Sequence, residues 1–435
     1  MTTILVILIV TSSFVFSQTP DQRSLESAMR DKNWSEIERI LSRMNIENTT
    51  DPNLLGIYTM SLIQQNKSDK ALFFANRSLA LDSTRMQAWL VLAECFARTN
   101  QRDANLNTLE GAVRRFPDSV QTMWALGLAY AKAGRYEKAI APLEDVMFRR
   151  SDPSVLVELA KCYFKTGQFS AAAELHQVLV DQYPDVAPYR VAAGESCMSS
   201  GKVAQAIVHF DAAIRLDSNN REAYFLLTGA LQEHGDSTRA FNVASLTAVK
   251  YPQDPMAWYN LGLLNMRLQR HEVASKALKR AVGLRPNYGE AYFNLGAAYE
   301  QQGFTEDAIN AFKRCALVSA QLAPDAYNSI AIVHRRSGNL GEALSAHMQA
   351  IALRDTASVL HISRINTCFD ADQCSMAAAF IKVAVEKFPR SPDVLYACLR
   401  CLVRTGDAQQ ITELHTRLEE LSPELAQQIT SMMKR

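Results

Sequence analysis

Small and apolar residues recur along the chain at intervals close to 34 residues, and alanine marks the interval most clearly. Within each interval the apolar positions follow the spacing expected of helices. The pattern predicts two helices per repeat, here called helix A and helix B, for nearly every segment after Gln18. The alanines of the pattern are Ala71, Ala139, Ala172, Ala206, Ala240, Ala274, Ala308, Ala343 and Ala377.

Glycine and proline mark where these helices end and begin. If the alanine is numbered position 20 of each repeat, glycine recurs at position 15, where the chain leaves helix A and a positive φ costs least without a side chain. Proline recurs at position 32, just past helix B, and at the start of helix A, where a missing N–H costs nothing. The glycines are Gly134, Gly167, Gly201, Gly235, Gly303, Gly338 and Gly406.

Two consecutive repeats carry a recognisable motif. The first reads Trp258-x-x-Leu261-Gly262, followed by Ala274 and Pro286, and the second reads Tyr292-x-x-Leu295-Gly296-x-x-Tyr299, followed by Ala308 and Phe312. This pattern resembles the tetratricopeptide repeat (TPR). The resemblance implies an all-α fold, an α-solenoid wound as a right-handed superhelix of about twelve helix-turn-helix repeats. The repeats fill residues 18–423, with residues 424–435 as a capping helix, and start near residues 18, 52, 86, 120, 153, 187, 221, 255, 289, 324, 358 and 392.

A few positions depart from the pattern. Asn105 stands at the alanine position of the third repeat, which predicts a looser helix crossing there. In the eleventh repeat His361 and Arg364 occupy sites that are usually aromatic and leucine, so either helix A is distorted or the arginine is paired. Gln301 and Gln302, at the end of a helix A, are expected to point outward.

The N-terminus predicts export. Residues 4–10 are all apolar, and Val15-Phe16-Ser17 places fairly small residues at the −3 and −1 sites of a cut after Ser17. The run is short for a membrane span of about 20 residues, although no Lys or Arg precedes it. We expect residues 1–17 to be a cleaved signal peptide, which would leave a periplasmic or secreted protein without a membrane span. The alternative is a protein anchored in a membrane by the uncleaved segment.

Charge and motifs argue against several function classes. Lys plus Arg number 46 and Asp plus Glu 45, a net charge of +1, which gives no electrostatic reason to expect nucleic-acid binding. The sequence contains no His-Glu-x-x-His, no Gly-x-Ser-x-Gly and no zinc-finger pair of CxxC motifs. His176, His347 and His415 share position 24 and are expected to be packing residues. We expect no catalytic, cofactor or metal site, and therefore no enzyme.

Eight cysteines matter more if the protein is exported, because disulfides persist in oxidising compartments. Most fall on helix faces expected to pack inward, as small buried apolar residues. Cys368 and Cys374 flank the turn between helices A and B of the eleventh repeat. Three states are open for this pair: free thiols, a disulfide across the turn, or a metal site shared with Cys398 and Cys401.

The resemblance implies that helix A of each repeat lines a concave groove in which peptides or partner helices dock. Position 5 carries Phe225, Tyr259 and Phe293 in three consecutive repeats. Aromatic side chains on a groove are effective anchors, but these rings could instead pack against neighbouring helices. Asn260 and Asn294, at position 6, are able to hydrogen-bond a peptide backbone whatever its sequence.

A second groove segment is basic. The residue set of the carboxylate clamp found in chaperone-binding TPR proteins is absent, but Arg335, Arg336, Arg400 and Arg404 fall on groove positions of the tenth and twelfth repeats. They form either a site for an acidic segment or an ordinary solvated face. The sequence therefore predicts a non-enzymatic scaffold that binds protein or peptide segments in its groove. The alternative is a module that presents substrate to a separate enzyme, for example a carbohydrate-modifying one.

Overall fold

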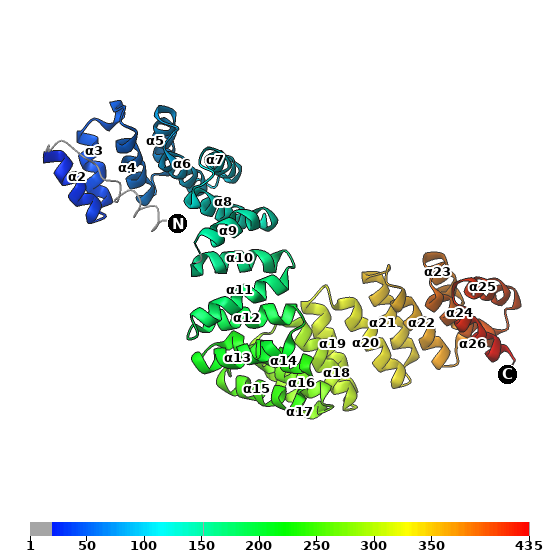
Figure 1. The fold of residues 1–435 in the computed structure, drawn as a ribbon. Coiled ribbons are helices and arrows are strands. Elements are labelled where there is room, and N and C mark those ends of the chain that lie inside the picture. Colours follow the sequence, from blue (N-terminus) through cyan, green and yellow to red (C-terminus); the bar gives the residue numbers. More distant parts are fainter. Residues whose placement is uncertain (1–19, 151, 435) are drawn as a thin grey trace. The chain divides into compact units, whose positions relative to one another are not determined.

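The computed structural model describes residues 20–150 and 152–434. The predicted signal peptide, residues 1–17, lies outside the described residues. The described residues form 25 α-helices and contain no strand, which confirms the all-α repeat fold. The chain divides into two compact units, one ending at Ala223 and the other beginning at Tyr224, with the boundary inside α14 (Arg221–His234). Helices A and B alternate along both units (Figure 1).

The helix bounds follow the predicted two-helix repeat. The first unit contains α2 (Pro20–Arg30), α3 (Trp34–Arg43), the 3₁₀ helix η1 (Ile46–Asn48), α4 (Pro52–Gln64), α5 (Ser68–Leu81), α6 (Met86–Arg98), α7 (Arg102–Arg115), α8 (Val120–Lys132), α9 (Tyr136–Arg149), α10 (Pro153–Lys165), α11 (Phe169–Gln182), α12 (Ala187–Ser199) and α13 (Val203–Leu216). The second unit continues with α15 (Ser237–Lys250), α16 (Pro255–Arg267), α17 (His271–Leu284), α18 (Gly289–Gln301), α19 (Thr305–Val318), α20 (Ala323–Arg336), α21 (Leu340–Leu353), α22 (Ser358–Asp370), the 3₁₀ helix η2 (Cys374–Ala377), α23 (Ala378–Lys387), α24 (Pro392–Thr405), α25 (Ala408–Leu421) and α26 (Pro423–Met433).

Helix starts are fixed by polar caps next to proline. Asp51, Asp152 and Asp254 each accept a hydrogen bond from a backbone N–H in the first turn of α4, α10 and α16. Proline follows each of these aspartates as the first residue of its helix. The cap satisfies one free N–H, and proline removes another.

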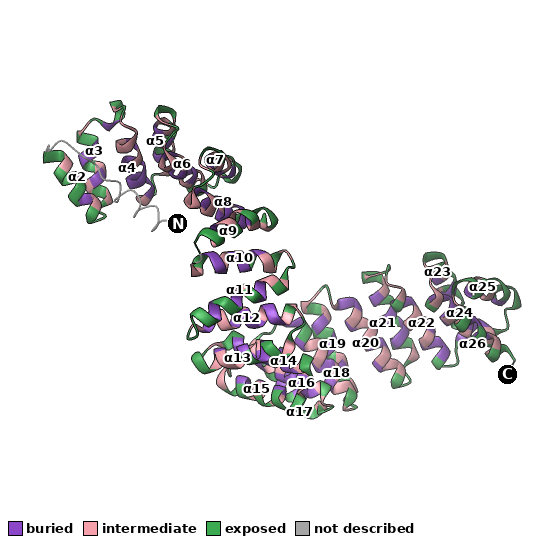
Figure 2. Cartoon of the chain, in the orientation of Figure 1, coloured by how far each residue is buried: buried purple, intermediate pink, exposed green. Residues whose placement is uncertain are grey.

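The alanines of the 34-residue pattern lie in the core of the repeats. All nine alanines of the pattern are 0% exposed. Buried residues lie on the faces that successive helices turn toward each other, whereas the turns are exposed (Figure 2). Small residues are needed on both helices: a Cβ placed on Gly296 of α18 would lie 2.8 Å from a ring carbon of Phe312 in α19. The two helices of each repeat thus cross closely.

The turn from helix A to helix B adopts a positive φ in all twelve repeats. Seven of these residues are the glycines at position 15. The other five have side chains: Lys32, Asn66, Asn100, Gln269 and Asp372. Asn and Asp tolerate the left-handed region, but Lys32 and Gln269 have no such preference. The repeat fold therefore imposes this conformation even where the residue disfavours it.

The departures from the repeat pattern have local explanations. Asn105 donates a hydrogen bond from Nδ2 to the carbonyl of Ala93, 2.6 Å away, so its amide bridges helices α6 and α7. His361 Nε2 contacts the Asp355 carbonyl six residues earlier. The indole N–H of Trp258 makes the same bond to Pro252, also six residues earlier, so His361 reproduces the contact of the usual aromatic residue.

Arg364 stacks on an aromatic ring. Its guanidinium lies 3.4 Å from the ring centroid of Phe380, and burial lowers the pKa of this arginine. Helix α22, which carries Arg364, is continuous from Ser358 to Asp370. The irregularity of the eleventh repeat lies instead in helix B, which begins as the 3₁₀ helix η2 before α23.

Gln302 does not point outward as predicted. Its side-chain amide nitrogen, Nε2, donates to the carbonyl of His271, the first residue of the preceding helix B, at 3.1 Å. Gln65 makes the equivalent bond to Trp34 at 3.2 Å. A glutamine at the end of helix A therefore ties one repeat to the one before it, while Gln301 is exposed as expected.

Candidate peptide-binding groove

Three consecutive A helices of the second unit carry the predicted aromatic residues. Phe225 on α14, Tyr259 on α16 and Phe293 on α18 are all partly buried. The ring of Tyr259 lies 4.9 Å from that of Tyr288, and Phe293 meets Phe312 edge-on at 5.4 Å. The rings of Tyr259 and Phe293 thus pack partly on the core and keep part of their surface exposed. Their role as anchors for a ligand stays a prediction.

The two predicted asparagines differ in their contacts. Asn294 donates from Nδ2 to the Glu290 carbonyl at 2.8 Å and approaches the Tyr259 hydroxyl at 3.4 Å. This second contact joins α18 to α16 beside the aromatic stripe of Phe225, Tyr259 and Phe293. Burial, with Glu290 nearby, raises the pKa of Tyr259, so the hydroxyl stays protonated at neutral pH. Asn260 is partly buried and makes no hydrogen bond to other described residues, so its amide is open to a ligand.

Asn328 on α20 extends this stripe and was missed in the sequence. It follows Asn294 at the same interval that separates Asn294 from Asn260. The repeat starting at 289 is one residue longer, which moves Asn328 to position 5, where Phe293 stands one repeat earlier. Its Oδ1 atom is buried and has no hydrogen-bond partner among the described residues. An unpaired buried carbonyl oxygen is costly. In the sequence, the interval of 34 residues from Asn294 is the signal that could have revealed Asn328.

The four arginines of the basic segment all contact other residues of the chain, through ion pairs, ring stacking or a hydrogen bond. Arg335 pairs with Asp370 and Arg336 with Glu300, each in an adjacent repeat. Arg404 pairs with Asp372 at 2.7 Å. Arg400 has no carboxylate partner among the described residues: its guanidinium lies 3.8 Å from the ring centroid of Phe369 and bonds Asn366. Three of the four charges are thus balanced within the chain, which weakens the attraction for an acidic ligand.

A surface cavity of about 470 Å³ lies beside the first two arginines. Its lining residues come from the end of α20, the turn to α21, the start of α21 and the end of α22 with the residue after it: Arg335, Arg336, Gly338, Leu340, Asp370 and Ala371. The Arg335–Asp370 ion pair forms part of the wall. The cavity therefore combines an internal ion pair with apolar surface, and it lies apart in the sequence from the stripe on α14, α16 and α18.

The three histidines at position 24 pack as predicted. His176 and His347 are buried and bond the hydroxyls of Ser196 and Thr367 in the next helix A, at 2.9 and 2.8 Å. Burial lowers the pKa of both to about 4. Within residues 20–434, no three His, Cys, Asp or Glu side chains are grouped to hold a metal ion. No helix in this described part is both long and apolar enough to cross a membrane.

Comparison with protein families identifies the repeats. Family models described as TPR repeat or tetratricopeptide repeat match residues 98–154, 130–193, 266–303 and 293–358. Together with the buried alanines of the 34-residue pattern and the helix pairs, these matches show that the chain is a tetratricopeptide repeat protein.

Individual relatives are distant. The chain is 23% identical over 174 residues to the BBSome complex member BBS4 of Bos taurus, across 40% of this chain and 34% of the relative. It is 23% identical over 282 residues to the TPR repeat-containing protein YpiA of Bacillus subtilis (strain 168), across 62% of this chain and 65% of the relative. The chain thus spans about a third and about two thirds of these relatives. Yeast Tom70 superposes with a TM-score of 0.40 at 14% identity, covering 88% of this chain and 95% of Tom70.

The repeat family supports a role as a protein–protein interaction scaffold. TPR proteins are in general non-enzymatic scaffolds. The geometry of the second unit offers two candidate surfaces for such a role, the aromatic stripe and the basic segment.

Proposed function

We propose that this protein binds a peptide segment of a partner protein along α14, α16, α18 and α20. Phe225, Tyr259 and Phe293 would receive apolar side chains of that segment. The observation that carries the proposal is the recurrence of a partly exposed aromatic ring at one position of three consecutive A helices. Rings held by the core on one side lose little side-chain entropy on binding, so they are efficient anchors.

The asparagines supply polar contacts beside this stripe. Asn260 has a free amide, and Asn328 has a buried carbonyl oxygen without a partner. A backbone carbonyl of the ligand would accept a hydrogen bond from the Asn260 amide. A backbone N–H of the ligand would donate to Asn328 Oδ1 once this buried side chain turned toward it. Because an unsatisfied buried oxygen costs about 1–3 kcal/mol, pairing it favours the bound state. Asn294 is already bonded to its own helix and contributes less.

The basic segment has the smaller part in the proposal. Arg400 is the arginine best placed to meet an acidic side chain, because Arg335, Arg336 and Arg404 would first have to leave Asp370, Glu300 and Asp372. Binding is therefore expected to depend mainly on apolar contacts. Added salt should change the affinity of the groove only weakly, since exposed ion pairs contribute little and are screened.

The test uses peptides selected from a display library on the full-length protein. The affinity of a selected peptide is then measured by fluorescence anisotropy for the wild type and for a variant with Phe225→Ala, Tyr259→Ala and Phe293→Ala. Loss of anchor residues should weaken binding by about 2 kcal/mol or more, roughly 30-fold in Kd. The circular dichroism spectrum of this variant should keep its helical signal.

The matched control changes three exposed apolar residues on B helices of the same compact unit, namely Val249, Leu317 and Met348, to alanine. They are 75%, 73% and 56% exposed. This control should leave the Kd within about twofold of wild type. An unchanged Kd in the stripe variant, or an equal loss in both variants, would remove the stripe as the binding surface.

A further inference from the structure

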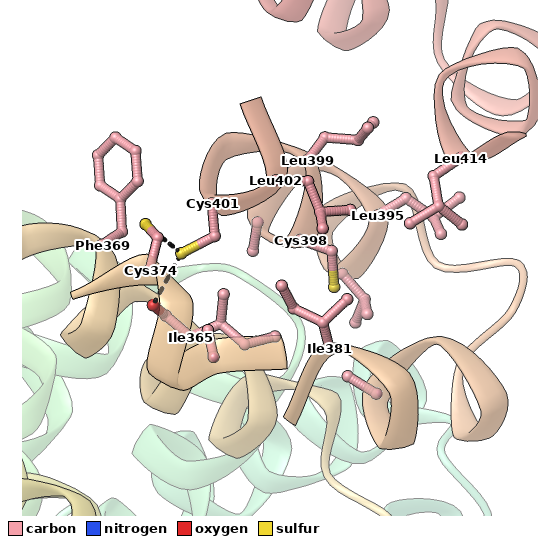
Figure 3. Packing of buried hydrophobic residues seen from close by; sticks show 14 of the residues in the cluster. Ile365, Phe369, Cys374, Ile381, Leu395, Cys398, Leu399, Cys401, Leu402 and Leu414 are labelled. Carbon is pink, nitrogen blue, oxygen red and sulfur yellow. Dashed lines mark hydrogen bonds between the residues drawn. The ribbon is translucent and has the colours of Figure 1, made fainter. Parts of the chain in front are cut away.

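Two cysteines from adjacent repeats meet in the core of the second unit. Cys374 is the first residue of η2, and Cys401 lies in α24, 27 residues further along the chain. Their sulfur atoms are 2.7 Å apart (Figure 3). We propose that Cys374 and Cys401 are a site of oxidative modification, at which a disulfide joins the eleventh repeat to the twelfth.

The partner of Cys374 differs from the one considered in the sequence, where a disulfide across the turn to Cys368 was one of three open states. All eight cysteines are free thiols here. The sulfur of Cys374 faces α24, because η2 turns its first residue toward that helix. Cys398 lies one turn before Cys401, but Figure 3 shows its sulfur directed toward Ile381. Only a small approach of the two sulfurs, about 0.7 Å from 2.7 Å, separates the contact from a disulfide bond of about 2.0 Å.

The oxidant required is a disulfide, either a small molecule or a disulfide-exchanging protein. The Cys374 thiolate attacks one sulfur of that disulfide, forms a mixed disulfide and releases the first thiolate. Cys401 then loses its proton and attacks the sulfur of Cys374, releasing the second thiolate. Two protein thiols are oxidised, one external disulfide is reduced to two thiols, and the two protons remain with the solvent and the products.

The two cysteines suit these separate roles. Cys374 is 5% exposed at the start of a short 3₁₀ turn, whereas Cys401 is 0% exposed inside α24. Cys374 is therefore the thiol that an external disulfide reaches first, and Cys401 resolves the intermediate. Burial, with Cys374 beside it, raises the pKa of the Cys401 thiol. The second step should accordingly be the slower one and should accelerate with rising pH.

The cross-link would fix the irregular part of the eleventh repeat. It joins η2 to α24, the helix that carries Arg400 and Arg404. Both arginines stack on Phe369, at 3.8 and 3.9 Å from the ring centroid. In the folded protein, oxidation would hold this stacked surface against the turn. In the unfolded chain, the disulfide would close a loop of 27 positions and so lower the conformational entropy of the unfolded state.

The test oxidises the full-length protein with oxidised glutathione and maps the products by mass spectrometry without reduction. Trypsin cuts after Arg364, Lys382, Arg390, Arg400 and Arg404, so Cys401 falls in peptide 401–404 and Cys398 in peptide 391–400. The expected product is peptide 365–382 linked to peptide 401–404. Because peptide 365–382 also contains Cys368, the link is assigned with the variants Cys374→Ser and Cys368→Ser.

Cys374→Ser should abolish the link, and the matched control Cys368→Ser should retain it. The oxidised wild type should melt several degrees above the reduced protein, a difference that Cys374→Ser should lack. A link from peptide 365–382 to peptide 391–400 would overturn the proposal. So would a link that survives in Cys374→Ser, or eight free thiols on a wild-type protein that stays folded under the oxidant.

Discussion

Gly262 offers a direct test of the close helix crossing on which the fold depends. It lies in α16, and a Cβ added there would be 2.6 Å from Cγ and 2.9 Å from Cδ2 of Leu278 in α17. Leu278 is 0% exposed, so its side chain has no free space to move into. Gly262→Ala should therefore push α16 and α17 apart, at a cost of about 1–3 kcal/mol for overpacking. The higher helix propensity of alanine returns about 1 kcal/mol, which leaves a net destabilisation of up to about 2 kcal/mol.

The matched control is Gly229→Ala in α14. A Cβ at Gly229 has no atom within 4 Å, so the same substitution should stabilise the protein by about 0.5–1 kcal/mol. Urea unfolding followed by circular dichroism measures both. In a third variant, Leu278→Ala should cost about 2–5 kcal/mol, and adding Gly262→Ala to it should cost nothing more, because the clash is gone. Equal effects of Gly262→Ala and Gly229→Ala would refute the assigned crossing.

Three further predictions concern the turns, the histidines and the N-terminus. Gln269→Gly should stabilise the protein by about 1 kcal/mol in urea unfolding, because Gln269 has a φ of 57° that glycine adopts freely; a loss of stability would contradict this. The pKa of His347 is lowered to about 4 in the folded protein, so protonation favours unfolding: this stability is present above the unfolded pKa near 6.5 and is lost as pH falls from there to about 4, by up to about 1.4 kcal/mol per pH unit. His347→Asn should flatten that part of the stability–pH curve, and an unchanged slope would count against the assignment. The mature protein should begin at Gln18, and an intact mass that still includes Met1 to Ser17 on native protein would rule out cleavage.

The repeat pattern alone was enough to predict the fold. Alanine at position 20 is small because two helices cross closely there, and glycine at position 15 allows the positive φ of the turn. Their spacing therefore indicates helix pairs without knowledge of any particular contact. The positive φ of Gln269 shows that the position itself requires this conformation, because the turn keeps it even with a residue that disfavours it.

Contacts between repeats were harder to predict. Arg335 and Asp370 are 35 residues apart, and Arg336 and Glu300 are 36 apart. Such pairs are found only by comparing each residue with those about one repeat away. A somewhat wider comparison would also have drawn attention to a Cys374–Cys401 pair, 27 residues apart, and to the hydrogen bond from Gln302 to His271, 31 residues apart. From the sequence, a disulfide was considered only between Cys374 and Cys368, and an outward glutamine was expected.

The aromatic stripe was predicted by position, but its balance between packing and exposure was not. The sequence cannot show that Phe293 rests on Phe312, or that Tyr259 rests on Tyr288, since these contacts depend on ring orientation. The one-residue insertion that moves Asn328 into the stripe also changes its role, from a helix-bonded amide like that of Asn294 to an unpaired one.

The binding claim is tested most directly by a photoreactive residue placed in the stripe. Benzoylphenylalanine replaces Tyr259 in one variant and Val249, which is 75% exposed on helix B, in another. Each is irradiated with a peptide selected on the wild-type protein, and the adduct is located by mass spectrometry. If the stripe binds the peptide, a cross-link should form from position 259, excess unlabelled peptide should suppress it, and little should form from position 249. Equal labelling at both positions, or labelling at position 249 alone, would contradict it.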